Sequence, residues 1–172
     1  MPRLTQAKAL VFDVRGYPTI SPKWLTHLSP KPLQSALWNV PRHHRPDHTD
    51  VEWMTDRWNL EPAEPQLTTH RVFLADGSAI SYAESLMGIV EAYHLGEIVG
   101  EPTAGTNGNI CLVDSPLGYR MVFTGMKVLK HDGSRHHGVG IQPTVRVAQT
   151  LPGIRDGRDE QLERALELLR VE

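Results

Sequence analysis

Ser81 is the first residue for which the sequence indicates a possible role in catalysis. It follows the run Asp76-Gly-Ser-Ala-Ile80 and precedes an apolar-periodic stretch that reaches His94. The short apolar run at residues 72–74 predicts a buried strand, and the spacing after Ser81 predicts a helix. A hydroxyl at a helix start lies beside backbone N–H groups and the positive end of the helix dipole. Ser81 is therefore a candidate nucleophile with a place for a developing oxyanion beside it.

The same position also suits a purely structural serine. Serine is a preferred N-cap residue, and capping serines greatly outnumber nucleophiles, so the local sequence favours a cap. A nucleophile also needs a base within hydrogen-bond reach, and one sequence does not show proximity. The choice between the two roles therefore depends on the rest of the chain.

Length and composition narrow the class of protein. The 172 residues suffice for one domain with a real core, and the apolar and charged fractions are ordinary for a globular protein. The net charge is −2 and the basic residues are scattered, which argues against nucleic acid or an anionic membrane as a partner. The single cysteine, Cys111, excludes an internal disulfide and a cysteine-based metal cage. Its apolar surroundings predict a buried structural thiol.

The segments around Ser81 predict the elements that would position it. Residues 8–14 form a continuous apolar run, typical of a central strand with both faces covered. Ser21-Pro22 is a good N-cap and first helical residue, so a short helix is expected to Leu28. Residues 97–100 read as the strand after the helix. The buried face of that helix is expected to carry Ala83, Leu86, Met87, Val90 and His94.

The second half of the chain predicts hairpins followed by a helix. Strands are expected at residues 109–113, 119–124, 126–130 and 144–147. Asp156 can cap a final helix, whose buried stripe would be Leu162, Ala165, Leu166 and Leu169. Strands that alternate with helices, together with a block of hairpins, predict an α/β domain.

Residues 33–69 are expected to be an irregular insertion rich in Pro, Trp and His within this domain. Large apolar groups argue against disorder, so short edge strands are expected at 35–40 and 51–53. A groove there would be lined by three tryptophans, Trp38, Trp53 and Trp58. The three close histidines, His43, His44 and His48, suit a polar loop better than a metal site, because no carboxylate–histidine helix pattern accompanies them.

Five segments in order resemble those of a known family. They are Asp13–Gly16, Asp76–Glu84, Gly100–Gly105, Asp132–Ser134 and Gly138–Pro143. Together they resemble the C-terminal processing peptidases and the tricorn-type serine peptidases, the tail-specific protease family in its broad sense, from about residue 8 to 148. The resemblance implies a crotonase/ClpP-like α/β spiral of ββα units, incomplete here at its N-terminal side. Residues 1–172 would then be a single catalytic-type domain, the C-terminal portion of a longer protein.

The resemblance also implies roles for individual residues. Ser81 stands where the family has its nucleophile, three residues before Glu84. The backbone N–H of Tyr82 would be one oxyanion donor, and the turn after the first strand, at Gly16, would supply the other. No metal and no organic cofactor is implied.

This chain differs from the family pattern at the position of the general base. The processing peptidases use a lysine at the position of Thr106, and tricorn-type members use a histidine from an earlier segment. The base would therefore lie on a preceding part of the protein, or His137 would serve, since imidazole titrates near neutrality. A loop histidine that hydrogen-bonds to backbone is an equally good interpretation of His137. His131 and His136 are expected to face solvent.

The expected function is that of a serine-type endopeptidase acting on peptides or unfolded proteins, weakly active or inactive as an isolated chain. The missing N-terminal part of the same protein is the expected partner, a homo-oligomer is a further option, and an extracytoplasmic location is preferred. The alternative is a non-catalytic module of the same fold that binds a peptide or a lipid through the tryptophan groove. A crotonase-like acyl-CoA enzyme shares the fold but explains neither the segment before Ser81 nor the Gly138–Pro143 loop.

Overall fold

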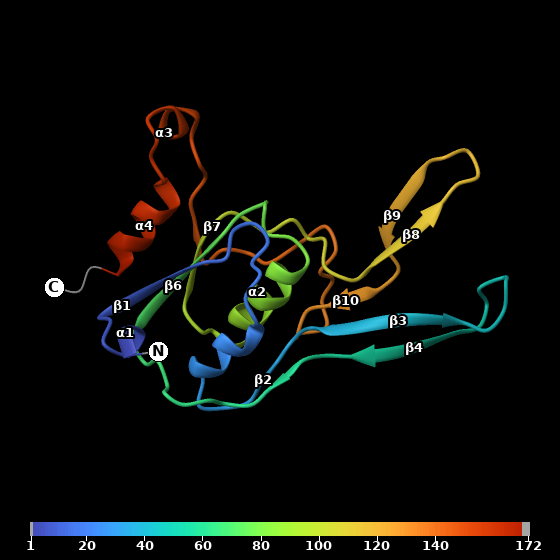
Figure 1. Cartoon of the computed structure of the whole chain (residues 1–172), viewed down its shortest axis with the longest axis horizontal. Helices are drawn as coiled ribbons and strands as arrows, with labels where there is room; N and C mark the ends of the chain where they lie inside the picture. Colours follow the sequence, from blue (N-terminus) through green and yellow to red (C-terminus); the bar gives the residue numbers. More distant parts are fainter. Residues whose placement is uncertain (1, 170–172) are drawn as a thin grey trace.

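The computed structural model describes residues 2–169. Its centre is a parallel sheet of β1 (Ala9–Asp13), β6 (His70–Ala75), β7 (Glu97–Gly100) and β11 (Val145–Arg146). The strands lie side by side in the order β1-β6-β7-β11 (Figure 1). This mixed α/β architecture confirms the fold class predicted from the alternation of strands and helices.

Two helices cover the two faces of strand β6. Successive strand residues point to opposite faces, and all four residues from Val72 to Ala75 are buried. Phe73 packs in the cluster that includes the apolar face of α2 (Tyr82–Tyr93). Leu74 packs in a second cluster with Ala165 of α4 (Glu160–Leu168). Since β6 is covered on both faces, the turn that follows it has a rigid support.

The first strand does not occupy the central position that its sequence suggested. β1 pairs with β6 along one edge and forms the end of the sheet in the described chain. Only Leu10 of its five residues is fully buried. The prediction of a central strand was therefore wrong: an apolar run also suits an edge strand that packs against neighbours such as Trp24 and Phe73.

Residues 33–69 contain more regular structure than the sequence indicated. They hold β2 (Leu33–Gln34), β3 (Leu37–His43), β4 (Val51–Asp56) and β5 (Asn59–Leu60). β3 pairs antiparallel with β4 and with β10 (Lys127–Leu129), while β2 pairs with β5. Before them, α1 spans Pro2–Thr5, and η1 (Pro22–His27) is a 3₁₀-helix whose N-cap is Ser21, as the sequence predicts.

A second hairpin, β8 (Ile110–Asp114) with β9 (Arg120–Thr124), projects from the same side of the domain as β3–β4 (Figure 1). Within the described chain no further layer covers its two faces, and its apolar side chains are exposed. Cys111 is accordingly exposed, and the prediction of a buried thiol was wrong. The apolar pattern resembles that of a core strand, but this two-stranded hairpin stands apart from the core.

The C-terminal segment differs from its prediction in its details. α3 (Leu151–Arg155) precedes α4, and α4 is capped by Asp159, whose Oδ1 accepts the Leu162 N–H at 3.0 Å. Asp156 instead ends α3. Leu166 is 52% exposed and lies outside the buried stripe. No helix of residues 2–169 has both the length and the apolar character needed to cross a membrane.

Candidate active site

Ser81 lies at the corner where the chain leaves β6 and enters α2. Its backbone has φ 49° and ψ −103°, outside the regions that L-residues ordinarily occupy. Such strain costs about 1–3 kcal/mol and is typical of functional turns between a strand and a helix. The side chain is half-buried and lines a cavity. A strained serine that lines a cavity at a helix start has the backbone setting in which serine nucleophiles are found.

A short hydrogen-bonded turn joins β6 to Ser81 and to the loop that follows β1. Asp76 Oδ1 accepts the Ser78 N–H at 2.9 Å and the Ser78 hydroxyl at 2.5 Å. The Ser78 Oγ in turn accepts the Gly16 N–H at 2.9 Å. Gly16 has φ +77°, a conformation that favours glycine. The structure thus brings the Gly16 turn next to the segment before Ser81, but the Gly16 N–H already has an acceptor.

The Ser81 cavity has a volume of about 340 Å³ and a largely aromatic wall. Its lining consists of Tyr17, Trp38, Val40, Asp56, Trp58, Ser81, Tyr82, Ser85, Asn107, Gly108, Asn109 and Met126. The ring of Tyr82 lies 6.1 Å from Tyr17 and 5.4 Å from Trp58, whose ring lies 5.2 Å from Trp38. This continuous aromatic wall beside a serine hydroxyl suits an extended peptide or an apolar group.

Of the three tryptophans predicted to line a groove, the structure brings Trp38 and Trp58 to this cavity. Trp53 does not line it. It lies on β4, 43% exposed, with Lys127 Nζ 4.4 Å from its ring centroid. Side chains alternate along a strand, so a tryptophan can lie on this hairpin without facing the cavity.

Tyr82 contributes through both its backbone and its ring. It is the first residue of α2, and the first N–H groups of a helix have no acceptor within the helix. Its phenol donates to the Ile20 carbonyl at 2.7 Å. Burial, together with the nearby Tyr17, raises the pKa of Tyr82, so the phenol stays protonated at neutral pH. The Tyr82 side chain therefore forms part of the cavity wall, and the Tyr82 backbone N–H is available to an oxyanion.

Glu84, one turn into α2, joins three segments around Ser81. Its buried carboxylate accepts the Thr103 hydroxyl at 2.7 Å and the Gly105 N–H at 2.6 Å on Oε1. Oε2 accepts the Thr106 N–H at 2.8 Å and the Ser81 N–H at 3.2 Å. One side chain thereby holds the backbone of Ser81 against the loop at 101–106.

The ionised form of Glu84 is the stable one in this site. Burial alone would raise its pKa, but the adjacent ring of His136 and the hydrogen bonds from the Thr103 hydroxyl and the Thr106 N–H lower it. The sum of these effects lowers the pKa below the ordinary glutamate value. His136 Nε2 lies 3.2 Å from Oε1, within ion-pair distance but off the line of a good hydrogen bond.

Two glycines explain why the glycine-rich segments lie side by side. A Cβ on Gly105 would lie 2.9 Å from the backbone nitrogens of Gly138 and Val139. A Cβ on Gly140 would lie 2.4 Å from the Thr103 carbonyl oxygen. The loops at 101–106 and 136–141 therefore pack backbone against backbone, and a side chain at either glycine would separate them.

The structure places the two neighbouring histidines differently from the sequence interpretation. His136 is 1% exposed, so the expectation that it faces solvent was wrong, because Glu84 attracts it inward. His137 is half-buried, and its Nε2 accepts the Val128 N–H at 3.3 Å. His131 is exposed, as predicted. None of the nine histidines, all within residues 2–169, lines the Ser81 cavity.

Asn107 is a cavity residue that the sequence interpretation missed. The dipeptide Asn107-Gly108 is typical of a turn and does not by itself indicate a cavity residue. The structure buries Asn107 to 2% exposure, and its Oδ1 accepts the Ser85 hydroxyl at 3.2 Å. Its Nδ2 has no hydrogen-bond partner among the described residues. One feature of the sequence could have indicated that Asn107 lies at the site. It directly follows Thr106, which stands where the processing peptidases have their lysine.

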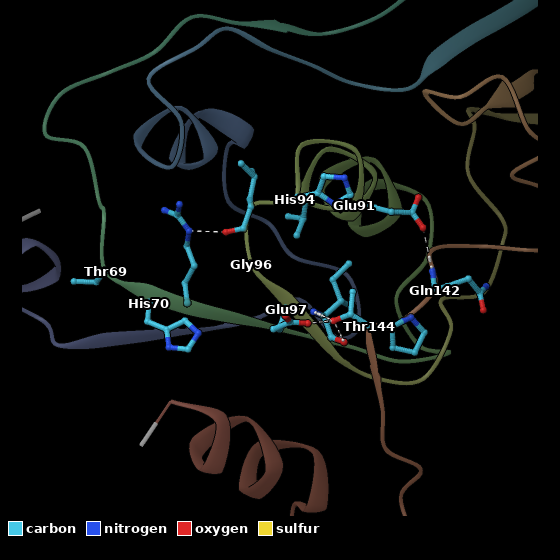
Figure 2. A pocket seen from close by; sticks show the side chains of 13 residues that line it. Thr69, His70, Glu91, His94, Gly96, Glu97, Gln142 and Thr144 are labelled. Atoms are coloured by element: carbon cyan, nitrogen blue, oxygen red, sulfur yellow. Dashed lines mark hydrogen bonds between the residues drawn. The ribbon is translucent and has the colours of Figure 1, made fainter. Parts of the chain in front are cut away.

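A second, larger cavity of about 590 Å³ lies at the other end of the sheet (Figure 2). It is lined by residues at the starts of β6 and β7 and by the end of α2, including His70, Glu97 and His94. Figure 2 shows Glu91 directed at Gln142 and Glu97 directed at Thr144, each in a hydrogen bond. Within residues 2–169, no group of three or more His, Cys, Asp or Glu side chains is arranged to hold a metal ion.

Both the sequence and the fold of this chain are similar to those of known proteins. Residues 3–147 match the description "Peptidase family S41". The comparison with curated proteins gives no match. Among solved structures, the fold is similar to that of a candidate peptidase from Parabacteroides merdae, with a TM-score of 0.79 and 22% identity over 96% of this chain and 53% of that chain.

Two further solved structures share the fold. Mature CPAF matches with a TM-score of 0.75 and 15% identity over 98% of this chain and 44% of its own. Tricorn protease matches with a TM-score of 0.65 and 16% identity over 96% of this chain and 15% of its own. The chain thus spans about half the length of the first of these structures and less of the others.

Proposed function

This chain belongs to peptidase family S41, and from that premise we propose that it hydrolyses peptide bonds with Ser81 as the nucleophile. The observation that carries the proposal is the strained corner at Ser81, which presents its side chain to a cavity at the N-terminus of α2. In the reaction, Ser81 Oγ attacks the carbonyl carbon while the Tyr82 N–H stabilises the developing oxyanion. The Gly16 N–H would become a second donor by exchanging its Ser78 acceptor for the substrate.

The substrate we propose is an extended segment of a peptide or an unfolded protein. The aromatic wall formed by Trp38, Trp58 and Tyr82 offers apolar contact area next to Ser81. A folded protein would not reach a half-buried hydroxyl in a cavity of this size. Trp53, outside the cavity, would contact only the more distant part of such a chain.

The general base is the least complete part of this site. We propose that a histidine takes the proton from Ser81, and that it comes from a part of the protein that precedes this chain. His137 stays the internal candidate, but it would have to release the Val128 N–H and move to the cavity. The isolated chain is therefore expected to be slow. The whole domain would then be a crotonase/ClpP-like spiral, of which residues 1–172 form the C-terminal portion. An extracytoplasmic location and a homo-oligomer are further expectations of the family resemblance.

Covalent labelling tests the proposal directly. A biotin-tagged fluorophosphonate should label the chain at Ser81, as located by peptide mass spectrometry, and Ser81→Ala should abolish the label. Thr106→Lys would restore the lysine of the processing peptidases, and we expect it to speed labelling by about tenfold or more. Labelling at another residue, or none in either the folded chain or its folded Thr106→Lys variant, would exclude Ser81 as the nucleophile.

A second candidate function is a non-catalytic module that binds a peptide or a lipid. The observation in its favour is that neither a histidine nor a lysine lines the described cavity, while two tryptophans and two tyrosines do. Saturable quenching of tryptophan fluorescence by an apolar peptide, without phosphonate labelling of Ser81, would favour the module. Labelling at Ser81 would favour the peptidase.

A further inference from the structure

The oxyanion site proposed for Ser81 has one free donor from the backbone. The Tyr82 N–H is available at the helix start, whereas the Gly16 N–H already donates to Ser78 Oγ at 2.9 Å. A tetrahedral intermediate is best stabilised by more than one donor that is in place before the reaction. A second donor would be a group of the cavity whose N–H has no acceptor.

Asn107 carries such a group. It lines the cavity with Ser81, is 2% exposed, and its Nδ2 has no partner among residues 2–169. A buried donor without an acceptor is costly in a folded protein, and such groups call for an explanation. A substrate oxygen would supply the missing acceptor.

The orientation of this amide is set by its neighbours. Ser85, one helical turn after Ser81, donates its hydroxyl to Asn107 Oδ1 at 3.2 Å, which leaves Nδ2 as the free end. The peptide before Asn107 is held because the Thr106 N–H donates to Glu84 Oε2 at 2.8 Å. Glu84 also holds the Ser81 N–H, so nucleophile and amide are positioned by the same carboxylate. Because these contacts hold Asn107 before a substrate binds, its amide would lose little further freedom when it donates to a developing charge.

We propose that Asn107 Nδ2 is an oxyanion donor of this site, acting together with the Tyr82 N–H. The inference rests on the proposed function, since it concerns the reaction at Ser81. As the Ser81 Oγ–carbon bond forms, the electron pair of the C=O double bond moves to the oxygen. Tyr82 N–H and Asn107 Nδ2–H donate to that oxygen, and the hydroxyl proton passes to the base.

The test is the rate of phosphonylation by the same fluorophosphonate, in which the Ser81 Oγ–phosphorus bond forms, the phosphorus–fluorine bond breaks and fluoride leaves. Asn107→Asp keeps the shape and the acceptor for Ser85 but removes the donor. Asn107→Ala removes both and decides the test if the aspartate variant does not fold. We expect each folded variant to react about 100-fold more slowly, mainly in the maximal rate and less in the half-saturating concentration.

Asn59→Asp is the matched control. Asn59 also accepts a side-chain hydrogen bond through Oδ1, from Gln34 Nε2 at 2.9 Å, and it lies on β5 outside the Ser81 cavity. Its labelling rate should stay within about twofold of that of the unmodified chain. If Asn107→Asp and Asn107→Ala also label at nearly the unmodified rate, the inference is overturned and the proposed function stands. If neither the unmodified chain nor its folded Thr106→Lys variant is labelled at Ser81, both are overturned.

Discussion

The two cavities lie at opposite ends of the same parallel sheet, and the smaller one contains the candidate nucleophile. The larger, of about 590 Å³, lies at the starts of β6 and β7. The smaller, of about 340 Å³, lies beyond the end of β6, next to Ser81. Ligands of open α/β sheets bind beyond the carboxyl ends of the strands. Strand direction, rather than volume, therefore distinguishes the candidate active site.

The backbone at the two ends of α2 shows the same difference. His94, beside the larger cavity, has φ 50° and ψ 48°, the left-handed conformation with which many helices end. Ser81, beside the smaller cavity, has a similar φ but ψ −103°, which no helix cap requires. An ordinary cap explains the first residue, whereas the second is strained in a way that accompanies function.

Unused hydrogen-bonding groups differ between the cavities as well. The larger cavity also contains a buried hydroxyl, that of Thr69, which has no hydrogen-bond partner within residues 2–169. A hydroxyl rotates freely, so it is not aimed at any one position. The amide of Asn107 is planar and is held through Ser85, so its free N–H points in one direction. A fixed orientation, in addition to the lack of a partner, therefore distinguishes the Asn107 amide from the Thr69 hydroxyl.

The largest effect that would test this comparison is expected at two glutamates of α2. Glu84→Ala removes a buried acceptor of several donors and should lower the free energy of unfolding by about 3–5 kcal/mol. Glu91→Ala, beside the larger cavity, breaks a partly exposed pair with Lys130 and should cost about 1 kcal/mol or less. Urea denaturation of both variants measures the difference. Equal losses in the free energy of unfolding would mean that these two side chains stabilise the two ends of α2 to the same extent.

The pH dependence of Glu84 should be the next largest effect. Because folding lowers its pKa, the ionised carboxylate stabilises the protein above its ordinary pKa of about 4.5, and this stability is lost as the pH falls through the folded value. Glu84→Gln lacks this contribution. The stability gap between the unmodified chain and this variant should shrink by about 1 kcal/mol or more between about pH 7 and pH 3. A gap that stays constant over this range would contradict the lowered pKa.

The smallest difference is expected between the two non-glycine residues with positive φ that flank α2, Ser81 and His94. Ser81→Gly should relieve strain and raise the free energy of unfolding by about 1–2 kcal/mol, while abolishing phosphonate labelling. His94→Gly should raise it by only about 0.5–1 kcal/mol, because the left-handed cap is less strained. Thermal denaturation of the two variants shows which substitution stabilises the protein more. A stabilisation at His94 larger than that at Ser81 would remove the argument that strain is concentrated at the serine.

Local periodicity predicted the element that carries Ser81. The apolar face of α2 contains the predicted Ala83, Leu86, Met87 and Val90, all fully buried. The predicted fifth member, His94, is exposed instead, because the helix ends there and the chain turns away. Periodicity follows from the helix itself, so it is readable in the sequence until the helix ends.

Burial of individual polar and reactive groups could not be predicted in this way. His136 was expected to face solvent but is buried beside Glu84, a residue 52 positions earlier. Cys111 was expected to be buried but is exposed on a projecting hairpin. Such outcomes depend on which distant segment packs against a residue, and one sequence contains no direct record of that packing.

By itself, the sequence determined the α/β class, the strand-turn-helix unit around Ser81 and the glycine-rich segments that accompany it, because these follow from local spacing. Only the tertiary structure decided that Glu84 joins Ser81 to the 101–106 loop. It also decided that the Gly16 N–H already has an acceptor, whereas Asn107 Nδ2 has none within residues 2–169. The reason is physical. A local pattern defines which way a side chain points along its own element, but the partners of a hydrogen-bonding group are chosen when separate elements pack together.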